Sequence, residues 1–373
     1  MSRVSVAGRL VLADRVEPGR LIVDGGRIAG IEPDDVQRAG PYVMPGFVDV
    51  HVHGWAGNDA MGGRDALDGM SRTLLQRGVT SFLPTGVTST MPELVTFAES
   101  VRSWLLGAPT DGARPLGFNI EGPFISDAKR GAHNPELVRS SVDEALDLAA
   151  LVPITDGLRI MTVAPEIPGG LELIAWLRDR GVAVSLGHSA ATEAQARAGY
   201  AAGGRTTTHL FNGMSGVDHR RPGLAVAALT DDDIYVELIA DGHHVHPAVW
   251  ALIERAKPRD RLVLVSDALS MSGTGPGRAT LGGMDIDVYE DRATLAGSDT
   301  LAGSVIALDT AVRNVILEGL DVVAASAAAS ANPLALLGVS DRGTLAPGML
   351  ADVVVLDDAF RLQHVIRGGV WQA

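Results

Sequence analysis

The stretch VMPGFVDVHVHG, residues 43–54, is an apolar run that is interrupted by Asp49 and then by two histidines alternating with valine. Successive side chains of a β-strand point to opposite faces, so a strand here places Asp49, His51 and His53 on one face. One explanation is an exposed strand edge whose histidines face water. Because imidazole is a common metal ligand, a metal site is the other explanation.

From residue 43 onward, strand-like apolar runs alternate with helix-like segments, which is the pattern of an α/β fold. The eight candidate strands are YVMPGFVDVHVH, VTSFLPT, PLGFNIEG, RIMTVAP, VAVSLGHS, RTTTHLFN, IYVELIADGHH and RLVLVSDA. Helices are predicted between them, for example over PELVTFAESVRSWLL, GLELIAWLRDRG and ATEAQARAGYAAGG. Eight strands are the number that a TIM-type (β/α)8 barrel requires. An open doubly wound sheet is the alternative, but no glycine-rich phosphate loop follows the first strand.

The two ends of the chain have a different pattern. Residues 1–42 contain short alternating β elements, such as RLIVDGGRIAGI with its Gly-Gly turn, and residues 341–373 do the same. Chain termini often lie close together, so we expect both ends to pair into one small β-sandwich domain beside the barrel. The predicted organisation is a small β domain from residues 1–42 and 341–373 and a catalytic barrel from residues 43–340.

The composition narrows the chemistry. Of 373 residues, 46% are hydrophobic and none is cysteine, so a large core is available, thiolate sites are excluded, and a metal must bind His, Asp or Glu. A net charge of -14 argues against a nucleic-acid partner. The N-terminal residues lack a signal-peptide core, and VVAASAAASANPLALLGV is too weakly apolar for a membrane span. We therefore expect a cytoplasmic protein that binds neither nucleic acid nor membrane.

Polar side chains stand at the predicted carboxyl ends of the barrel strands, where the chemistry of TIM barrels takes place. They are His51 and His53 on the first strand, Glu121 on the third, His188 on the fifth, His209 on the sixth, Asp241 and His244 on the seventh and Asp267 on the eighth. A local role, such as a helix cap, explains each one separately. One metal site explains them together, and zinc, iron or manganese accepts such a ligand set. Neither Lys129 nor Lys257 ends a strand, so Glu121 is the predicted bridge between two metals.

These residues lie in motifs that resemble the amidohydrolase superfamily, and the resemblance covers nearly the whole chain. PGFVDVHVHG is typical of the superfamily as a whole, whereas EGPFI, SLGHS, THLFNGM and ADGHHV, in this order, resemble its branch of amino-sugar phosphate deacetylases. GAHNPE, RRPGL, LVSDA, TLAGS and GTLAPGMLADVVVLD add to the likeness. The resemblance implies a hydrolase of amino-sugar catabolism that converts N-acetyl-D-glucosamine 6-phosphate into D-glucosamine 6-phosphate and acetate.

The resemblance also implies one or two divalent metal ions per subunit, with zinc expected first and iron, manganese or cobalt as alternatives. Glu121, His188 and His209 resemble the ligands of one ion, and His51 with His53 resembles a second-site pair that some relatives lack. The implied metal ligands are therefore His51, His53, Glu121, His188, His209 and Asp267.

For catalysis, the resemblance assigns Asp267 as the catalytic carboxylate and His133, in GAHNP, as the contact to the acetyl carbonyl of the substrate. The phosphate of the sugar is expected to bind Asn212, Gly213, Arg220 and His244. Arg220 and His244 are expected from the neighbouring subunit, which implies a homodimer with shared active sites.

Two departures from the family pattern leave questions open. Gly213 stands where the family usually has alanine, and it is expected to loosen a backbone segment near the substrate. Arg221 follows Arg220 directly, so either arginine is a candidate for the phosphate. His243 and His246 have no assigned role beyond polar lining of the pocket mouth.

Two other functions stay open on the sequence alone. One is a different amidohydrolase, which acts on a cyclic amide or deaminates a base, because the superfamily-wide motifs fit it equally. The other is a non-catalytic scaffold that keeps the barrel for assembly, although scaffolds tend to lose the metal ligands that this chain retains.

Overall fold

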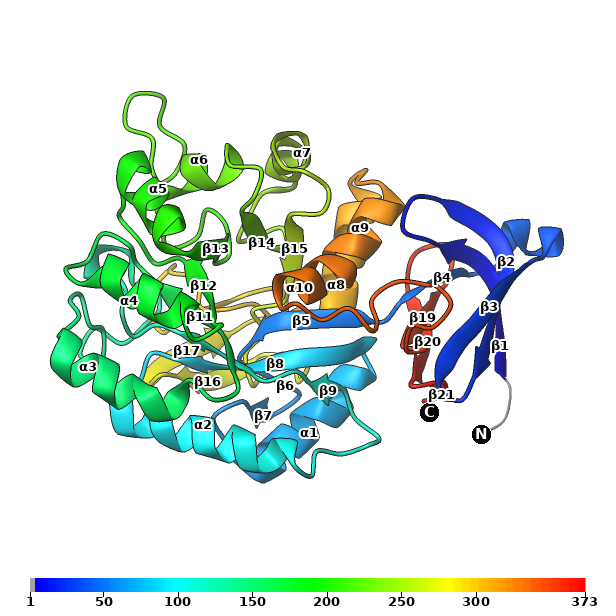
Figure 1. Ribbon diagram of the computed structural model, residues 1–373, viewed down its shortest axis with the longest axis horizontal. Coiled ribbons are helices and arrows are strands. Elements are labelled where there is room, and N and C mark those ends of the chain that lie inside the picture. The colour runs from blue at the N-terminus through cyan, green and yellow to red at the C-terminus, as the bar shows by residue number, and fades with distance from the viewer. Residues whose placement is uncertain (1–3, 373) are drawn as a thin grey trace.

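The computed structural model describes residues 4–372, within which eight parallel strands form a barrel (Figure 1). These strands are β5 (Phe47–Val52), β8 (Val79–Val87), β10 (Phe118–Glu121), β11 (Leu158–Val163), β12 (Ala183–Leu186), β13 (Gly204–Thr207), β14 (Tyr235–Ile239) and β15 (Leu262–Val265). They pair in this order, and β15 comes back beside β5, which nearly closes the barrel. The strands are buried on both faces, as is typical of parallel sheets. The predicted TIM-type barrel and all eight of its strands are confirmed.

Helices cover the outside of the barrel (Figure 1). They are α1 (Arg64–Leu75), α2 (Met91–Leu105), α3 (Glu144–Leu151), α4 (Gly170–Arg178), α5 (Glu193–Ala202), α6 (Leu224–Leu229), α7 (Pro247–Ala256), α8 (Leu308–Leu317), α9 (Val322–Ala328) and α10 (Ala331–Leu336). Short 3-10 helices are η1 (Asp35–Ala39), η2 (Asp127–Lys129) and η3 (Val152–Ile154). The helices predicted in the regions of α2, α4 and α5 are confirmed. None of the helices in residues 4–372 has the length and apolar character that crossing a membrane requires.

Local sequence signals set the ends of the helices. Thr90 caps the start of α2 and forms a capping box with Glu93, each satisfying a backbone N–H of the other. Helix α5 ends at Gly203, whose φ of 136° suits glycine and few other residues. Aromatic side chains fix α2 against the barrel, because the Trp104 ring packs edge-on against Phe82 with centroids 6.1 Å apart.

Both ends of the chain form one small sheet. Its strands are β1 (Val4–Val11), β2 (Val16–Asp24), β3 (Arg27–Pro33), β4 (Tyr42–Pro45), β19 (Val353–Leu356), β20 (Leu362–Arg367) and β21 (Val370–Trp371). The order is β21-β20-β19-β4-β1-β2-β3, so β4 joins strands from the two ends. Leu10, Leu21, Val353 and Ile366 belong to one apolar core, so the two halves of the curled sheet pack together. The predicted small β domain from both chain ends is confirmed.

The stretch VMPGFVDVHVHG crosses from the small sheet into the barrel. It was expected within a single strand, but the structure has two: β4 pairs with β1 and β19, and β5 starts at Phe47 in the barrel. Gly46 separates them, at a point where a Cβ atom would lie only 2.3 Å from the Oγ1 atom of Thr80. The small sheet therefore adjoins the beginning of β5, and His51 lies toward the opposite end of the barrel (Figure 1).

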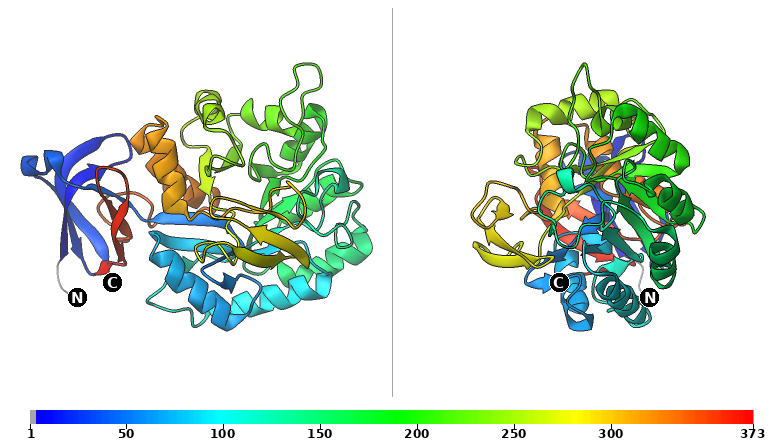
Figure 2. Two further views of the ribbon diagram at one scale, coloured as in Figure 1. Left: turned by 180° about the vertical axis from the view of Figure 1, so that it is seen from behind. Right: turned by 90° about the vertical axis from the view of Figure 1, so that its left-hand side faces the viewer.

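The remaining strands are short and lie outside both sheets or at their edges. They are β6 (Gly54–Trp55), β7 (Asn58–Asp59), β9 (Arg114–Pro115), β16 (Gly277–Leu281), β17 (Met284–Val288) and β18 (Ala293–Leu295). Figure 2 shows the antiparallel sheet β16–β18 in yellow, projecting from one side of the barrel. Leu281 and Ile286 of this sheet share an apolar cluster with Val87, at the end of β8. The β16–β18 sheet thus packs beside the carboxyl end of β8.

Candidate metal centre and active site

Seven of the predicted site residues come together at the carboxyl end of the barrel. They are His51, His53, Glu121, His133, His188, His209 and Asp267, each of them at most 5% exposed. This burial excludes a strand edge with histidines in water, which was the alternative for VMPGFVDVHVHG. Buried imidazole and carboxylate groups are expensive to desolvate unless they bind a partner.

Glu121 lies at the middle of this group. Its Oε1 atom is 2.8 Å from Nε2 of His209 and 3.0 Å from Nε2 of His188. Its Oε2 atom is 3.3 Å from Nε2 of both His53 and His133. A single carboxylate therefore contacts histidines from both halves of the centre.

The side chains can hold metal in two groups. In one, Nε2 of His53 lies 3.3 Å from Nε2 of His51 and 3.2 Å from Oδ1 of Asp267. The other contains Glu121, His133 and His188. The ligand atoms of each group lie within 4.8 Å of one another.

His209 and His133 are both within reach of the second group. Nε2 of His188 is 3.1 Å from Nε2 of His209 and 3.2 Å from Nε2 of His133. The sequence prediction placed His209 among the ligands and gave His133 to the substrate, and the distances allow either histidine as the third ligand.

The other ring nitrogen of three histidines fixes the tautomer. Nδ1 of His51 is 3.1 Å from a carboxylate oxygen of Glu237, and Nδ1 of His53 is 3.1 Å from the carbonyl oxygen of Thr85. Nδ1 of His188 is 2.8 Å from the carbonyl oxygen of Lys129. Carbonyl and carboxylate oxygens accept here, so each Nδ1 carries a hydrogen, and a ring without a second hydrogen directs the lone pair of Nε2 to the centre.

The donor set fits a divalent metal ion. The Nε2 lone pairs of His51 and His53 lie 3.3 Å apart, and they repel one another unless a cation or a proton lies between them. Histidine nitrogens with carboxylate oxygens are ligands that zinc, iron and manganese accept. Among residues 4–372, both groups of side chains that can hold a metal lie in this centre.

The pKa values show that the centre attracts positive charge. Burial disfavours the charged form of His53, but contacts with Asp267 and Glu121 outweigh it and raise its pKa to about 9. His51 behaves in the same way, because the same two carboxylates hold its pKa well above its usual value despite burial. His133 differs, since burial and the neighbouring His188 lower its pKa to about 4. At neutral pH His133 is therefore uncharged.

Three of the site residues have a left-handed backbone. The φ angles are 45° at His188, 25° at His209 and 50° at Asp267, and each residue stands two positions after the end of its barrel strand. Such conformations cost a non-glycine residue on the order of 1–3 kcal/mol. Strain of this kind concentrates at functional sites, where the surrounding structure holds it in place.

A cavity of about 350 Å³ opens onto the metal-ligating side chains. Asn212, Gly213 and His244, which were predicted to bind phosphate, also line it. His244 lines the cavity of its own chain, whereas the resemblance expects it from the neighbouring subunit. Asp241 holds it through a contact of 2.7 Å between Oδ2 and Nδ1, which raises the pKa of His244 despite its burial.

Gly213 was expected to loosen a backbone segment near the substrate, but its backbone is closely packed. Its φ is 56°, and a Cβ atom would lie 2.7 Å from Nδ1 of His188. Its carbonyl accepts the N–H of Ser189 at 2.9 Å. The glycine thus lets the backbone pass close to a metal-ligating histidine.

Arg220 is not among the residues that line this cavity. It lies on an exposed loop, where the carboxylate of Asp218 accepts the backbone N–H groups of Arg220 and Arg221. That Arg220 or Arg221 of a neighbouring subunit binds the phosphate stays a prediction. His243 has a contact outside the cavity, with its Nε2 atom 3.4 Å from Oδ2 of Asp291 in the turn between β17 and β18.

Sequence reasoning missed two parts of the site. Glu237 was hidden in the apolar run YVELI, where the signal was a charged residue inside a barrel strand. Thr300, Leu301 and Gly303 line the cavity and belong to TLAGS, a motif that occurs twice, at 294–298 and 300–304. The second copy is the one that reaches the cavity.

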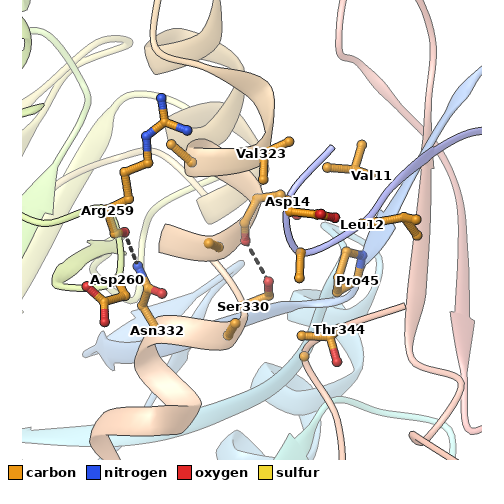
Figure 3. Close-up of a pocket in the computed structure, with 16 residues that line it drawn as sticks. Val11, Leu12, Asp14, Pro45, Arg259, Asp260, Val323, Ser330, Asn332 and Thr344 are labelled. Carbon is orange, nitrogen blue, oxygen red and sulfur yellow. Dashed lines mark hydrogen bonds between the residues drawn. The ribbon is translucent and has the colours of Figure 1, made fainter. Parts of the chain in front are cut away.

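A separate cavity of about 240 Å³ lies between the small sheet and the helices α9 and α10 (Figure 3). Two of its polar side chains have backbone partners. The amide of Asn332 donates to the carbonyls of Arg259 and Leu262, and the hydroxyl of Ser330 donates to the carbonyl of Ser326. Neither group of metal-ligating side chains lines it, so the barrel centre is the candidate active site.

A sequence model of the amidohydrolase family matches residues 42–371. An N-acetylgalactosamine-6-phosphate deacetylase of Escherichia coli O157:H7 is 38% identical over 98% of both chains. The human N-acetylglucosamine-6-phosphate deacetylase is 40% identical over 96% of this chain and 90% of that one.

Solved structures of deacetylases are also similar to this chain over nearly its full length. N-acetylglucosamine-6-phosphate deacetylase from Thermotoga maritima has a TM-score of 0.92 and 32% identity, and 99% of each chain is covered. A variant of the Mycobacterium smegmatis N-acetyl-D-glucosamine-6-phosphate deacetylase, solved in complex with N-acetyl-D-glucosamine-6-phosphate, has a TM-score of 0.91 and 32% identity over 100% of both chains.

Proposed function

Because this chain belongs to the amidohydrolase family, we propose that its barrel centre hydrolyses the amide of N-acetyl-D-glucosamine 6-phosphate and releases D-glucosamine 6-phosphate and acetate. The observation that carries the proposal is the buried His/Glu/Asp centre, which opens into the same cavity as Asn212, Gly213 and His244. Amino-sugar catabolism is the proposed role and the cytoplasm the proposed compartment.

For the metal, the proposal is two ions per subunit, with zinc first and iron, manganese or cobalt as alternatives. His51, His53 and Asp267 would hold one ion. Glu121, His188 and His209 would hold the other, with Glu121 between the two. A divalent cation supplies Lewis acidity in such a centre, which polarises an amide carbonyl and makes water a stronger acid.

Asp267 is the proposed proton carrier. Burial alone raises the pKa of a carboxylate, but His51 and His53 outweigh burial and lower the pKa of Asp267, so it is ionised at neutral pH. It can accept the proton of the attacking water and return it to the amine, because an amide nitrogen leaves poorly unless it is protonated.

His133 is the proposed donor to the oxygen of the acetyl group. Its Nδ1 atom lies 2.7 Å from the Oγ1 atom of Thr88. The Thr88 hydroxyl has one hydrogen, and its Oγ1 atom also lies 3.2 Å from the carbonyl oxygen of Glu121. When that hydrogen is donated to Nδ1 of His133, the shorter of the two contacts, the neutral ring keeps its own hydrogen on Nε2, which faces the centre. With a pKa of about 4, His133 donates this hydrogen without carrying charge.

The phosphate is proposed to lie near Asn212, Gly213 and His244, completed by Arg220 of a second subunit in a homodimer. A chain of net charge -14 needs such a local cation to hold a phosphorylated sugar. Arginine suits this task because its guanidinium binds phosphate through two parallel hydrogen bonds.

The direct test is acetate release by chelator-stripped protein, before and after zinc, iron, manganese or cobalt is added back. We expect release to require metal and to require the phosphate, so unphosphorylated N-acetyl-D-glucosamine is the matched control. Release of acetate by metal-free protein, or no release with any metal, would contradict the proposal.

N-acetyl-D-galactosamine 6-phosphate is a second candidate substrate. The relative from Escherichia coli that carries this activity in its name is 38% identical over 98% of both chains. The two sugars differ only in the configuration of one ring hydroxyl, so kcat/KM for both under identical conditions decides between them.

Mixing two impaired homodimers, assayed at a substrate concentration well below the KM of Arg220→Ala, tests the shared site. Asp267→Asn and Arg220→Ala damage different parts of the proposed site, and a mixed dimer has one site in which both residues are intact. Recovery of activity after subunits exchange supports sharing between subunits. No recovery, once exchange has been shown by mass spectrometry, places both residues in the site of one chain.

A further inference from the structure

Glu237 is a buried carboxylate that contacts two of the predicted metal ligands on the sides that do not face the centre. It lies on β14, its exposed fraction is 0%, and its Oε2 atom is 3.1 Å from Nδ1 of His51. The same Oε2 atom accepts the backbone N–H of His209 at 3.2 Å. One carboxylate oxygen therefore joins residues of both halves of the centre.

A carboxylate in the interior of a barrel is costly, so its partners indicate what it does. Its Oε1 atom has no hydrogen-bond partner among the described residues, which leaves the contacts of Oε2 as its hydrogen bonds there. A purely apolar side chain would fill this position in the core at lower cost. The two contacts of this buried carboxyl group, to His51 and to the backbone of His209, point to a role in the centre.

That role concerns the orientation of His51. His53 and His188 direct Nε2 inward by donating from Nδ1 to backbone carbonyls, which every residue type provides. His51 donates to a side chain instead, so the tautomer and the ring angle of His51 depend on the residue at position 237. Loss of the acceptor would free the His51 ring to turn or to exchange its hydrogen between the two nitrogens.

We propose that Glu237 is a positioning residue for a divalent cation at His51, His53 and Asp267. By accepting from Nδ1, it keeps the Nε2 lone pair of His51 directed at that group, and its bond to the His209 N–H aligns the second half of the centre. This inference rests on the proposed two-ion centre and adds the residue on which one of the ions depends.

The test is titration of the chelator-stripped protein with Zn²⁺ in competition with a chromophoric chelator, for the wild type, Glu237→Leu and Glu237→Gln. In Glu237→Leu we expect the Kd of one ion to rise about 10- to 100-fold and that of the other to change less than about threefold. Glu237→Gln should stay close to the wild type, because its amide oxygen can still accept from Nδ1 of His51.

A double-mutant cycle shows whether Glu237 acts through His51. His51→Asn should weaken the same ion, and adding Glu237→Leu to His51→Asn should cause no further loss. Thr206→Val is the matched control, because it also changes a buried polar residue on a barrel strand and its hydroxyl lacks a partner among residues 4–372. We expect Thr206→Val to bind both ions like the wild type.

The outcomes distinguish the positioning role of Glu237 from the two-ion centre on which it rests. Two ions in the wild type with unchanged affinities in Glu237→Leu would overturn the positioning role and leave the two-ion centre standing. Additive losses in the double variant, or an equal loss in Thr206→Val, would also overturn the positioning role, because they indicate a general structural effect. A wild type that binds a single ion would overturn the two-ion centre itself and this inference with it.

Discussion

The Nε2 atom of His53 lies 3.2 Å from the Oδ1 atom of Asp267 in the buried centre of the barrel. Glu121 approaches the same nitrogen to 3.3 Å. Two carboxylates around one imidazole favour a positive charge between them, which a proton or a metal ion can supply. Proton and metal therefore compete for His53.

The first prediction concerns the stability of the metal-free protein. The pKa of His53 rises from 6.5 to about 9 on folding, so the native state binds a proton more tightly than the unfolded state. The stabilisation is complete below pH 6.5, and it is lost as the pH rises to about 9. We expect His53 to contribute a fall of at most about 3 kcal/mol in the free energy of unfolding over this interval, and His51, whose pKa is also raised, to add to it.

Urea unfolding of the stripped protein between pH 6 and about 9.5 measures this loss. His53→Gln is the control, because it removes one titrating group and should reduce the slope of the unfolding free energy against pH, leaving the share of His51. An identical slope in the wild type and in His53→Gln would assign the effect to other groups.

The second prediction concerns Asp267. Asp267→Asn keeps the size of the side chain but removes its ability to accept a proton, so we expect kcat to fall by about 10²- to 10⁴-fold. Ion binding at Glu121, His188 and His209 should persist, which metal analysis of the purified variant checks. Turnover within a factor of about ten of the wild type would rule out Asp267 as the proton carrier.

The third prediction separates the two neighbouring arginines. Arg220→Ala should raise KM for the phosphorylated sugar about 10- to 100-fold, the cost of one charge-assisted contact. Arg221→Ala, whose exposed side chain lies one position further, should leave KM near the wild-type value. The opposite result would move the phosphate contact to Arg221, and equal small effects would remove both arginines from the site.

The fourth prediction concerns stability far from the centre. The Asp321 carboxylate caps α9 by accepting the N–H groups of Val323 and Ala324, each at 3.1 Å. Asp321→Ala should lower the free energy of unfolding by about 0.5–2 kcal/mol, whereas Asp321→Asn keeps the cap. Denaturant unfolding measures both, and kcat should not change. Equal destabilisation by the two substitutions would show that the cap is not the cause.

Much of the fold was visible in the sequence because the barrel strands are buried on both faces. Such strands appear as nearly continuous apolar runs, and a histidine or carboxylate at the end of a run stands out. His51, His188 and Asp267 could be placed on a common rim for this reason. The shared sheet of the two chain ends was predicted from their alternating patterns alone.

Other features depend on tertiary contacts that a sequence pattern does not contain. The left-handed backbone at His209 gives no signal, since the residue is not glycine. Glu237 lies inside an apolar run, and its contact with His51 joins strands that are far apart in the chain. The break at Gly46 arises because β4 and β5 pair with different sheets. The proposed contact of Arg220 with the phosphate involves a second copy of the chain, about which the pattern of one sequence carries no signal.

The pairing of β4 with β1 on one side and β19 on the other also matters during synthesis on the ribosome. β4, with the apolar residues Val43 and Met44, is translated before the whole barrel, whereas the segment Val353–Leu356 that completes its pairing is translated after the barrel. Until then the nascent chain presents an unpaired strand edge, a feature that invites association with other chains. This edge is therefore closed only after the barrel has been translated, and chaperones that bind nascent chains have the translation time of the barrel in which to protect it.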